Sequence, residues 1–206
     1  MRLFLFLLAL TFSQFAHPQK VVSKSVEFPA GSVARIDARQ CYVLQLDTRA
    51  GGEMVVEARM EGEYGGYNAI QLTREGNTLH LAAGFEPLFR KPNDKLGAHK
   101  VVSISLKILV PENRTVEILA DDAQLEVHGL YEHLQILQAS GYCGVYDAGR
   151  YVEIRTQTAD ILVASHAADI VANSRYGRVA PNGIPPGEAH FELYTISGNI
   201  NLIRTE

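Results

Sequence analysis

The sequence lacks the features that mark most enzymes and nucleic-acid-binding proteins. Acidic residues outnumber basic ones, 23 to 19, for a formal net charge of −4. A chain without a basic excess is poorly suited to displace phosphate counterions, which argues against nucleic acid as a partner. No serine or cysteine lies in a G-x-S-x-G elbow, and no His, Cys, Asp or Glu spacing matches a zinc or calcium site. We therefore expect a non-enzymatic protein that needs no metal or other cofactor.

Long apolar runs are absent after the first residues. Leu3 to Phe12 is apolar and Ser13 to Ala16 follows with small residues, which predicts a signal peptide over residues 1–16, cleaved after Ala16. A run of about ten residues is too short to cross ~30 Å of hydrocarbon, so a membrane anchor is not expected. The sequence thus predicts an exported protein, in the periplasm, on the cell surface or secreted, with no integral membrane segment after processing.

Cysteine is scarce. Only Cys41 and Cys143 are present, and an exported chain could join them in a disulfide. Cys143 falls on an apolar position of the repeat described below, and a buried free cysteine behaves as a small hydrophobe. Both a bridge and two free thiols are compatible with the sequence.

What the sequence does contain is a repeat over residues 112–206. Four apolar triplets begin 18 residues apart and a fifth follows after 21, at Val116, Leu134, Val152, Ile170 and Phe191. A second triplet begins nine residues after each, at Leu125, Cys143, Ile161, Val179 and Ile200. The turn between the two triplets always has a small residue at its centre: Ala123, Gly141, Ala159, Gly177 or Gly198. Small residues there indicate a tight bend with little room for a side chain.

Alternation within each triplet predicts β-strands with one buried face. Val116 and Ile118 should point inward and Glu117 outward. One unit cannot bury its apolar face alone, but stacked units can. The predicted fold class is all-β, a single-stranded parallel β-helix or solenoid with ~18-residue coils, wound right-handed as parallel crossovers usually are. An antiparallel sandwich with accidental periodicity is the alternative, which five in-phase copies disfavour.

The first half, residues 17–111, predicts a β region that caps the solenoid and forms one continuous unit with it. We expect strands over residues 25–28, 33–38, 41–47, 54–60, 69–74, 78–83 and 101–110, and no helix. The connection over residues 84–99 has no periodicity and carries Phe85, Leu88 and Phe89. Such a connection is either a functional loop or a plug that folds back on the open end of the solenoid, and we favour the plug.

Several motifs resemble a bacterial family known as auto-transporter adhesin, head GIN domain. They are Val26-Glu27-Phe28-Pro29, Glu75-Gly76-Asn77-Thr78-Leu79, Lys107-Ile108-Leu109-Val110-Pro111 and Thr195-Ile196-Ser197-Gly198-Asn199-Ile200-Asn201-Leu202. The resemblance covers the whole mature chain and implies an exported β-solenoid without catalytic residues. The chain departs from the family at Ala123 and Ala159, where the turn glycine is missing.

Two sets of outward side chains are candidates for function. One set is a row of outward, mostly acidic residues, which is typical of a solvated face. Gln135 and Val171 interrupt the row and so relieve repulsion between the carboxylates. The row consists of Glu117, Gln135, Glu153, Val171 and Glu192. Exposed tyrosines suit sugar rings or a protein partner, so the predicted ligand-binding residues are Tyr142, Tyr146 and Tyr151. We expect a non-catalytic, adhesin-like binding or scaffold module for an envelope polysaccharide or protein surface. A polysaccharide-acting enzyme on a β-helix and a lipid-binding protein are the alternatives.

Overall fold

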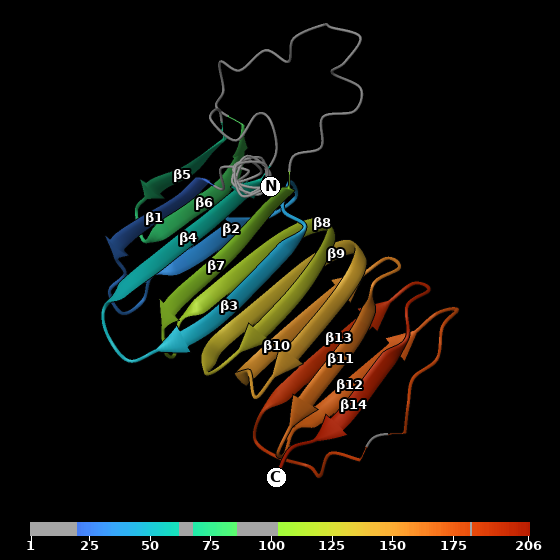
Figure 1. Cartoon of the computed structure of the whole chain (residues 1–206). Helices are drawn as coiled ribbons and strands as arrows, with labels where there is room; N and C mark the ends of the chain where they lie inside the picture. The colour runs from blue at the N-terminus through green and yellow to red at the C-terminus, as the bar shows by residue number, and fades with distance from the viewer. Residues whose placement is uncertain (1–19, 62–67, 86–102, 182) are drawn as a thin grey trace, which may run out of the picture.

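The computed structural model describes residues 20–61, 68–85, 103–181 and 183–206 (Figure 1). The predicted signal peptide and most of the connection over residues 84–99 lie outside these ranges, so both stay predictions. Every regular element within the described residues is a β-strand, which confirms the all-β class. The strands are β1 (Lys20–Glu27), β2 (Val33–Asp37), β3 (Val43–Arg49), β4 (Glu53–Glu61), β5 (Asn68–Glu75), β6 (Thr78–Phe85), β7 (Ser103–Pro111), β8 (Thr115–His128), β9 (Tyr131–Tyr146), β10 (Gly149–Thr156), β11 (Asp160–Ser165), β12 (Asp169–Ser174), β13 (His190–Thr195) and β14 (Ile200–Arg204).

The strands form two faces. Neighbouring strands in the first face follow the order β5, β6, β2, β8, β9, β10, β13, β12. The second face follows the order β1, β4, β7, β3, β8, β9, β11, β14. β8 belongs to both, because its first part pairs with β2 and its last part with β3. Each unit therefore contributes one arm to each face.

The predicted alternation is confirmed and builds one core. In β8, Val116, Ile118, Leu125 and Val127 are buried, and so are Ala120 and Ala123 at the bend between the two arms. The other residues of the strand are half-buried or exposed. Equivalent apolar residues of the other units join them in a single cluster that runs from Phe28 to Leu202. The two faces thus pack their inner side chains on each other, as apolar stripes on stacked strands require.

The sheet as a whole is mixed rather than parallel, because strands of the predicted capping region pair antiparallel with their neighbours. Pairing is parallel throughout residues 112–206, and β2 and β3 also pair in parallel with β8. β1, β4 and β5 instead pair antiparallel with their neighbours, and of these pairs only β5–β6 is a hairpin of consecutive strands. β1 also begins at Lys20, earlier than the predicted strand at residue 25. The division at residue 111 stays a prediction.

The last two units do not stack in sequence order. Phe191 is in register with Val152 on one side and with Ile170 on the other, so the fifth unit lies between the third and the fourth. On the second face, β14 likewise follows β11, and the fourth unit adds only an isolated bridge from Val179 to Ile200. The longer connection before β13 lets the chain return to this position. Phe191 becomes buried there, whereas Ile170 stays half-exposed.

The corner between the two arms is as tight as the small turn residues predict. A Cβ built at Gly198 would lie 2.0 Å from the carbonyl oxygen of Ala159, and one at Gly141 would lie 2.2 Å from that of Ala123. Both alanines are buried, so alanine fits wherever the next unit supplies glycine. This pairing explains why the departures at Ala123 and Ala159 are tolerated.

In the four later units a polar side chain lies three residues before the turn centre, at Gln138, Thr156, Ser174 and Thr195, whereas the first unit has Ala120 there. Gln138 Nε2 donates to the carbonyl of Ala123 at 2.7 Å, and Thr156 Oγ1 donates to that of Ala159 at 2.9 Å. Ser174 Oγ donates to the carbonyl of Gly198 at 2.8 Å. Buried carbonyls without a partner are costly, so these side chains compensate for turns that bend away from the strand ladder.

The cysteines form no bridge. Cys41 and Cys143 are both free and buried, and burial raises the pKa of each thiol to about 12. The structure thus selects the second of the two possibilities left open by the sequence, in which both cysteines act as small apolar residues.

We predict that Gly198→Ala destabilises the protein by about 2–4 kcal/mol, because the added methyl group overlaps the neighbouring turn backbone. The matched control is Gly183→Ala, where an added Cβ meets no atom within 4 Å. Urea unfolding of both variants measures the difference. Equal midpoints for the two variants would show that the corner is not the tight contact described.

Candidate functional site

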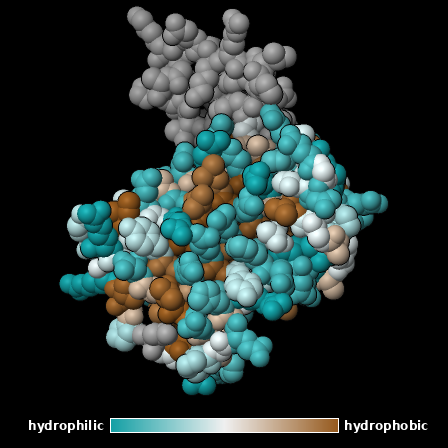
Figure 2. Space-filling model, turned by 180° about the vertical axis from the view of Figure 1, so that it is seen from behind, coloured by the Kyte–Doolittle hydropathy of each residue, from teal (hydrophilic) through white to brown (hydrophobic). Residues whose placement is uncertain are grey.

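A groove of about 410 Å³ crosses the first face over β5, β6, β2, β8 and β9. Leu119 and Leu137 form part of its lining and remain 39% and 40% exposed, although both are large apolar residues. They are neighbours because β8 and β9 pair in register, and Asp37 and Arg155 continue the same row on either side. In Figure 2, which views the side opposite to Figure 1, hydrophobic side chains gather in the middle of the molecule between hydrophilic ones. A concave apolar surface of this size is typical of a binding site.

Charged and polar side chains lie on the row of outward residues beside the leucines. Arg35 Nε donates to Glu117 Oε2 at 2.7 Å, and this contact raises the pKa of the Arg35 guanidinium. His80 Nε2 lies 3.6 Å from Glu75 Oε2. Arg35 and His80 belong to the row that continues Glu117 across β2 and β6. Sequence reasoning missed both residues, since they join the row only through strand pairing between distant segments.

A second, more polar hollow of about 380 Å³ adjoins the groove. The two share Asp37, Gln71 and Ala82. Arg39 donates to both carboxylate oxygens of Asp37, at 2.9 and 2.5 Å, and this hydrogen bonding holds the pKa of Asp37 below its usual range. The groove therefore leads from an apolar floor to a polar end, where the charges of Asp37 and Arg39 neutralise each other.

The acidic row faces outward as predicted, but its order differs. β13 pairs directly with β10, so Glu192 is the neighbour of Glu153, and Val171 lies beyond both. The prediction that Val171 separates the two glutamates was wrong, because the fifth unit inserts before the fourth. Glu153 is instead bound by Gln135 Nε2 at 3.0 Å and by Arg155 Nε at 2.5 Å.

These contacts bear on the enzymatic alternative. Arg155, then Gln135, stabilise the charged form of Glu153 and hold its pKa below the usual range. A glycoside hydrolase needs one carboxyl group with a raised pKa to act as general acid. Glu153 is shifted in the opposite direction, so this part of the row is better suited to a solvated, ion-paired surface than to acid catalysis.

The three predicted tyrosines do not share one surface. Tyr142 and Tyr146 lie in the last part of β9, on the second face, in register with β8 and β11. Tyr151 lies in β10 on the first face, next to His133, with ring centroids 6.4 Å apart. The structure thus brings two of the three residues together and separates the third.

Tyr142 and Tyr146 form a compact aromatic surface. Their hydroxyl oxygens are 3.3 Å apart, and both rings lie against Gly144, where an added Cβ would meet them at 3.0 Å. The ring of His128 stacks on that of Tyr146 at 4.4 Å with an interplanar angle of 5°. Desolvation, with the Tyr146 contact, raises the pKa of Tyr142. Glycine at position 144 is what lets the two rings approach.

Within the part of the chain that the structure describes, no three His, Cys, Asp or Glu side chains are placed to hold a metal ion. The same residues contain no helix long and apolar enough to cross a bilayer.

Comparison with known proteins supports the fold. No protein-family model and no curated protein sequence matches this chain. Among solved structures, a candidate cell adhesion protein from Clostridium sporogenes superposes with a TM-score of 0.68 at 13% identity, covering 91% of this chain and 100% of that one. A candidate adhesin from Bacteroides fragilis gives 0.43 at 13% identity, covering 92% and 99%. A candidate lipid-binding protein from Parabacteroides distasonis gives 0.28 at 11% identity, covering 89% and 97%. The first likeness shows a shared fold alone, and the other two are too distant to carry an argument.

We predict that Arg155→Gln raises the pKa of Glu153 toward its ordinary value, because it removes the main hydrogen-bond donor to the carboxylate. In the native protein the lowered pKa contributes stability above the ordinary carboxyl pKa, and this contribution is lost as pH falls through the folded value. NMR titration of the Glu153 carboxyl carbon measures the shift. Arg204→Gln, on an exposed residue of β14, serves as control, and an unchanged titration in Arg155→Gln would contradict the ion pair.

Proposed function

We propose that this protein is an exported, non-catalytic binding module that holds an aliphatic chain of an envelope molecule in the groove of the first face. The observation that carries the proposal is the chemistry of the groove: exposed leucines between charged groups that are already paired. Export rests on the predicted signal peptide, and membership of the head GIN domain family rests on the motif resemblance. A short right-handed solenoid is the winding we infer for residues 112–206.

The paired charges decide which ligand fits. Arg35 is held by Glu117 and Arg39 by Asp37, so a phosphate or carboxylate entering the groove would have to displace a carboxylate already in place. A neutral ligand meets no such competition. Burial of apolar surface contributes about 25 cal/mol per Å², so covering Leu119 and Leu137 favours a hydrocarbon chain.

The polar end of the groove suits the other part of an amphipathic ligand. Gln71 lines both hollows, and Gln40 and Asp121 line the second. Amide groups can donate and accept hydrogen bonds to ester or hydroxyl oxygens. We therefore place the chain over the leucines and the linkage to its polar part near Gln71.

We predict that the purified protein binds cis-parinaric acid methyl ester, a neutral fluorescent fatty ester. We expect Leu137→Glu to weaken that binding at least about tenfold, because a charge on the floor opposes burial of the chain. The matched control is Ile203→Glu, since Ile203 is 49% exposed but lies on β14 in the second face. Fluorescence titration measures both affinities.

Three results would count against the groove as an acyl site. They are no binding by the native protein, equal loss in Leu137→Glu and Ile203→Glu, and undiminished binding in Leu137→Glu. Far-ultraviolet circular dichroism of each variant shows whether the fold is retained.

A second candidate function rests on the Tyr142–Tyr146 surface. Two tyrosine rings lying side by side over Gly144, with His128 stacked on one of them, offer the flat amphipathic area that suits a sugar ring. This surface lies on the second face, separate from the leucine groove. Under this second proposal the partner is an envelope polysaccharide, and Tyr142 and Tyr146 are the residues that contact it. Tyr151, on the first face, would act in a separate contact.

We predict selective retention of the protein on one or more members of a panel of immobilised bacterial polysaccharides. The double variant Tyr142→Ala/Tyr146→Ala should lose retention, because each truncation removes a stacking surface, while Tyr151→Ala and Leu137→Glu should keep it. Affinity chromatography at fixed salt gives the measurement. Uniform passage of the native protein through the panel would refute the carbohydrate site and leave the groove untouched.

A further inference from the structure

β12 forms an open edge of the first face. It pairs with β13 on one side, and no other described strand pairs with it. Its inward residues Ile170 and Ala172 are half-buried, whereas their neighbours Phe191 and Leu193 are buried. On the second face, Val179 is 41% exposed beyond β14. The apolar core therefore reaches the surface at this end of the stack, and Figure 2 shows hydrophobic side chains gathered near the lower left of that view.

The backbone of this edge is available for pairing. The Asp169 amide donates to Ala189 and the Arg175 amide to Thr195, so the odd-numbered residues bond to β13. In a parallel ladder, alternate residues point their N–H and C=O groups to opposite sides. The backbone groups of Ile170, Ala172 and Ser174 thus point away from the molecule, without a strand partner among the described residues.

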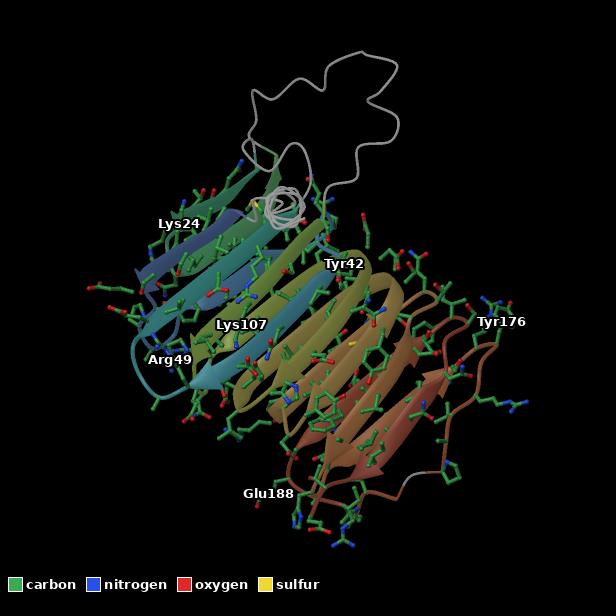
Figure 3. The ribbon with its side chains drawn as sticks, viewed as in Figure 1. Lys24, Tyr42, Arg49, Lys107, Tyr176 and Glu188 are labelled. Carbon is green, nitrogen blue, oxygen red and sulfur yellow. The ribbon has the colours of Figure 1, made fainter. Side chains whose placement is uncertain are left out.

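The opposite end of the stack is closed by two inward cations. Lys24 in β1 donates through Nζ to the carbonyl of Ile70 in β5, at 2.7 Å, and Arg74 in β5 donates to the carbonyl of Glu27 in β1. Inward charges on edge strands are a known protection against further pairing. Figure 3 shows Lys24 at this end and Tyr176 at the other. β12 has neither lysine, arginine nor proline in its six residues.

We propose that the β12 edge binds a second copy of this chain, forming a two-fold dimer through an antiparallel β12–β12 pair. The register follows from the outward backbone groups. With Ala172 opposite Ala172 of the second copy, Ile170 faces Ser174 across the pair, and each of these residues presents both bonding groups to the other strand. Such pairs exchange two hydrogen bonds each in an antiparallel ladder.

Charge complementarity selects the same register. Counting outward from Ala172, Asp169 of one copy lies opposite Arg175 of the other, and the two-fold axis repeats the contact. The Asp169 side chain lies 3.1 Å from His190 Nδ1 but is 71% exposed, and Arg175 is also exposed, so both can reach across. Opposite charges on facing strand positions stabilise a sheet. A second copy is therefore favoured over an arbitrary strand as the occupant.

The dimer also covers the exposed core. A two-fold axis normal to the sheet keeps the inner side of one copy on the inner side of the other, so Ile170 and Ala172 of both copies face one continuous interior. Removing these apolar groups from water is the main favourable contribution to such an association.

Sedimentation velocity over a concentration series tests the dimer with the purified protein. We expect a monomer–dimer equilibrium in the native chain and monomer alone in Ala172→Pro. Proline removes the outward N–H of that residue and places its ring where a partner strand would bond, and proline is tolerated on edge strands. Circular dichroism and thermal unfolding should match those of the native protein.

A charge exchange tests the register. Asp169→Arg and Arg175→Asp should each weaken the dimer by about threefold to tenfold, and the double variant should restore it, because the exchanged pair is again of opposite sign. The matched control is Arg204→Asp, because Arg204 is an exposed residue of β14. This variant should leave the dimer affinity unchanged. A native protein that stays monomeric at every concentration would overturn the proposal, as would a dimer that survives Ala172→Pro. Failure of the double variant to recover would overturn the register.

Discussion

The close approach of successive turns at the corner is the constraint on which the rest of the structure depends. The backbone at Gly141 and Gly198 passes so near the turn of the unit that precedes it in the stack that no Cβ fits. Strand spacing is set by hydrogen bonds, so the turns must stack at the same distance as the strands. The carbonyls that lose ladder partners there are bound by Gln138 and Thr156. Together these contacts fix the register of every unit on both faces.

The fixed register brings side chains from distant segments together on the surface. Because units align residue by residue, each outward position becomes a row across the face, and neighbours in a row come from distant segments. Leu119 and Leu137 lie side by side for this reason, and Arg35 meets Glu117, 82 residues away in the chain. The groove is thus a property of the stack rather than of any one loop. Glu117 pairs with Arg35 across a row, and Asp37 pairs with Arg39 along the chain, which leaves the apolar floor as the distinguishing feature.

Local and periodic features could be predicted from the sequence, while the order of stacking could not. Alternation in Val116 to Ile118 and the small turn centres correctly indicated inward residues and tight corners. The period also contained an unused signal, since Tyr142 and Tyr151 are nine residues apart, half a unit, and must fall on opposite faces. The inserted position of Phe191 is different in kind. With a spacing of 18 or 21 residues, a unit can stack either on the outer side of the preceding unit or between that unit and the one before it. Burial of the bulkier side chain determines which of the two orders forms.

The inserted fifth unit also explains why the two ends of the stack differ. Had the units stacked in sequence order, Phe191 and Leu193 would form the outermost layer and expose two large side chains. Insertion buries both and leaves Ile170 and Ala172 outermost, a smaller apolar surface on a strand with regular backbone geometry. At the other end, Lys24 in β1 and Arg74 in β5 each donate to a backbone carbonyl across the opening. The end formed by β1 and β5 is thereby covered by two charged side chains. The end formed by β12 exposes less apolar surface than it would if Phe191 and Leu193 were outermost, but it has no such cover among the described residues. A stack built by adding parallel units needs an end that stops growth, and among the described residues only the end formed by β1 and β5 carries that device.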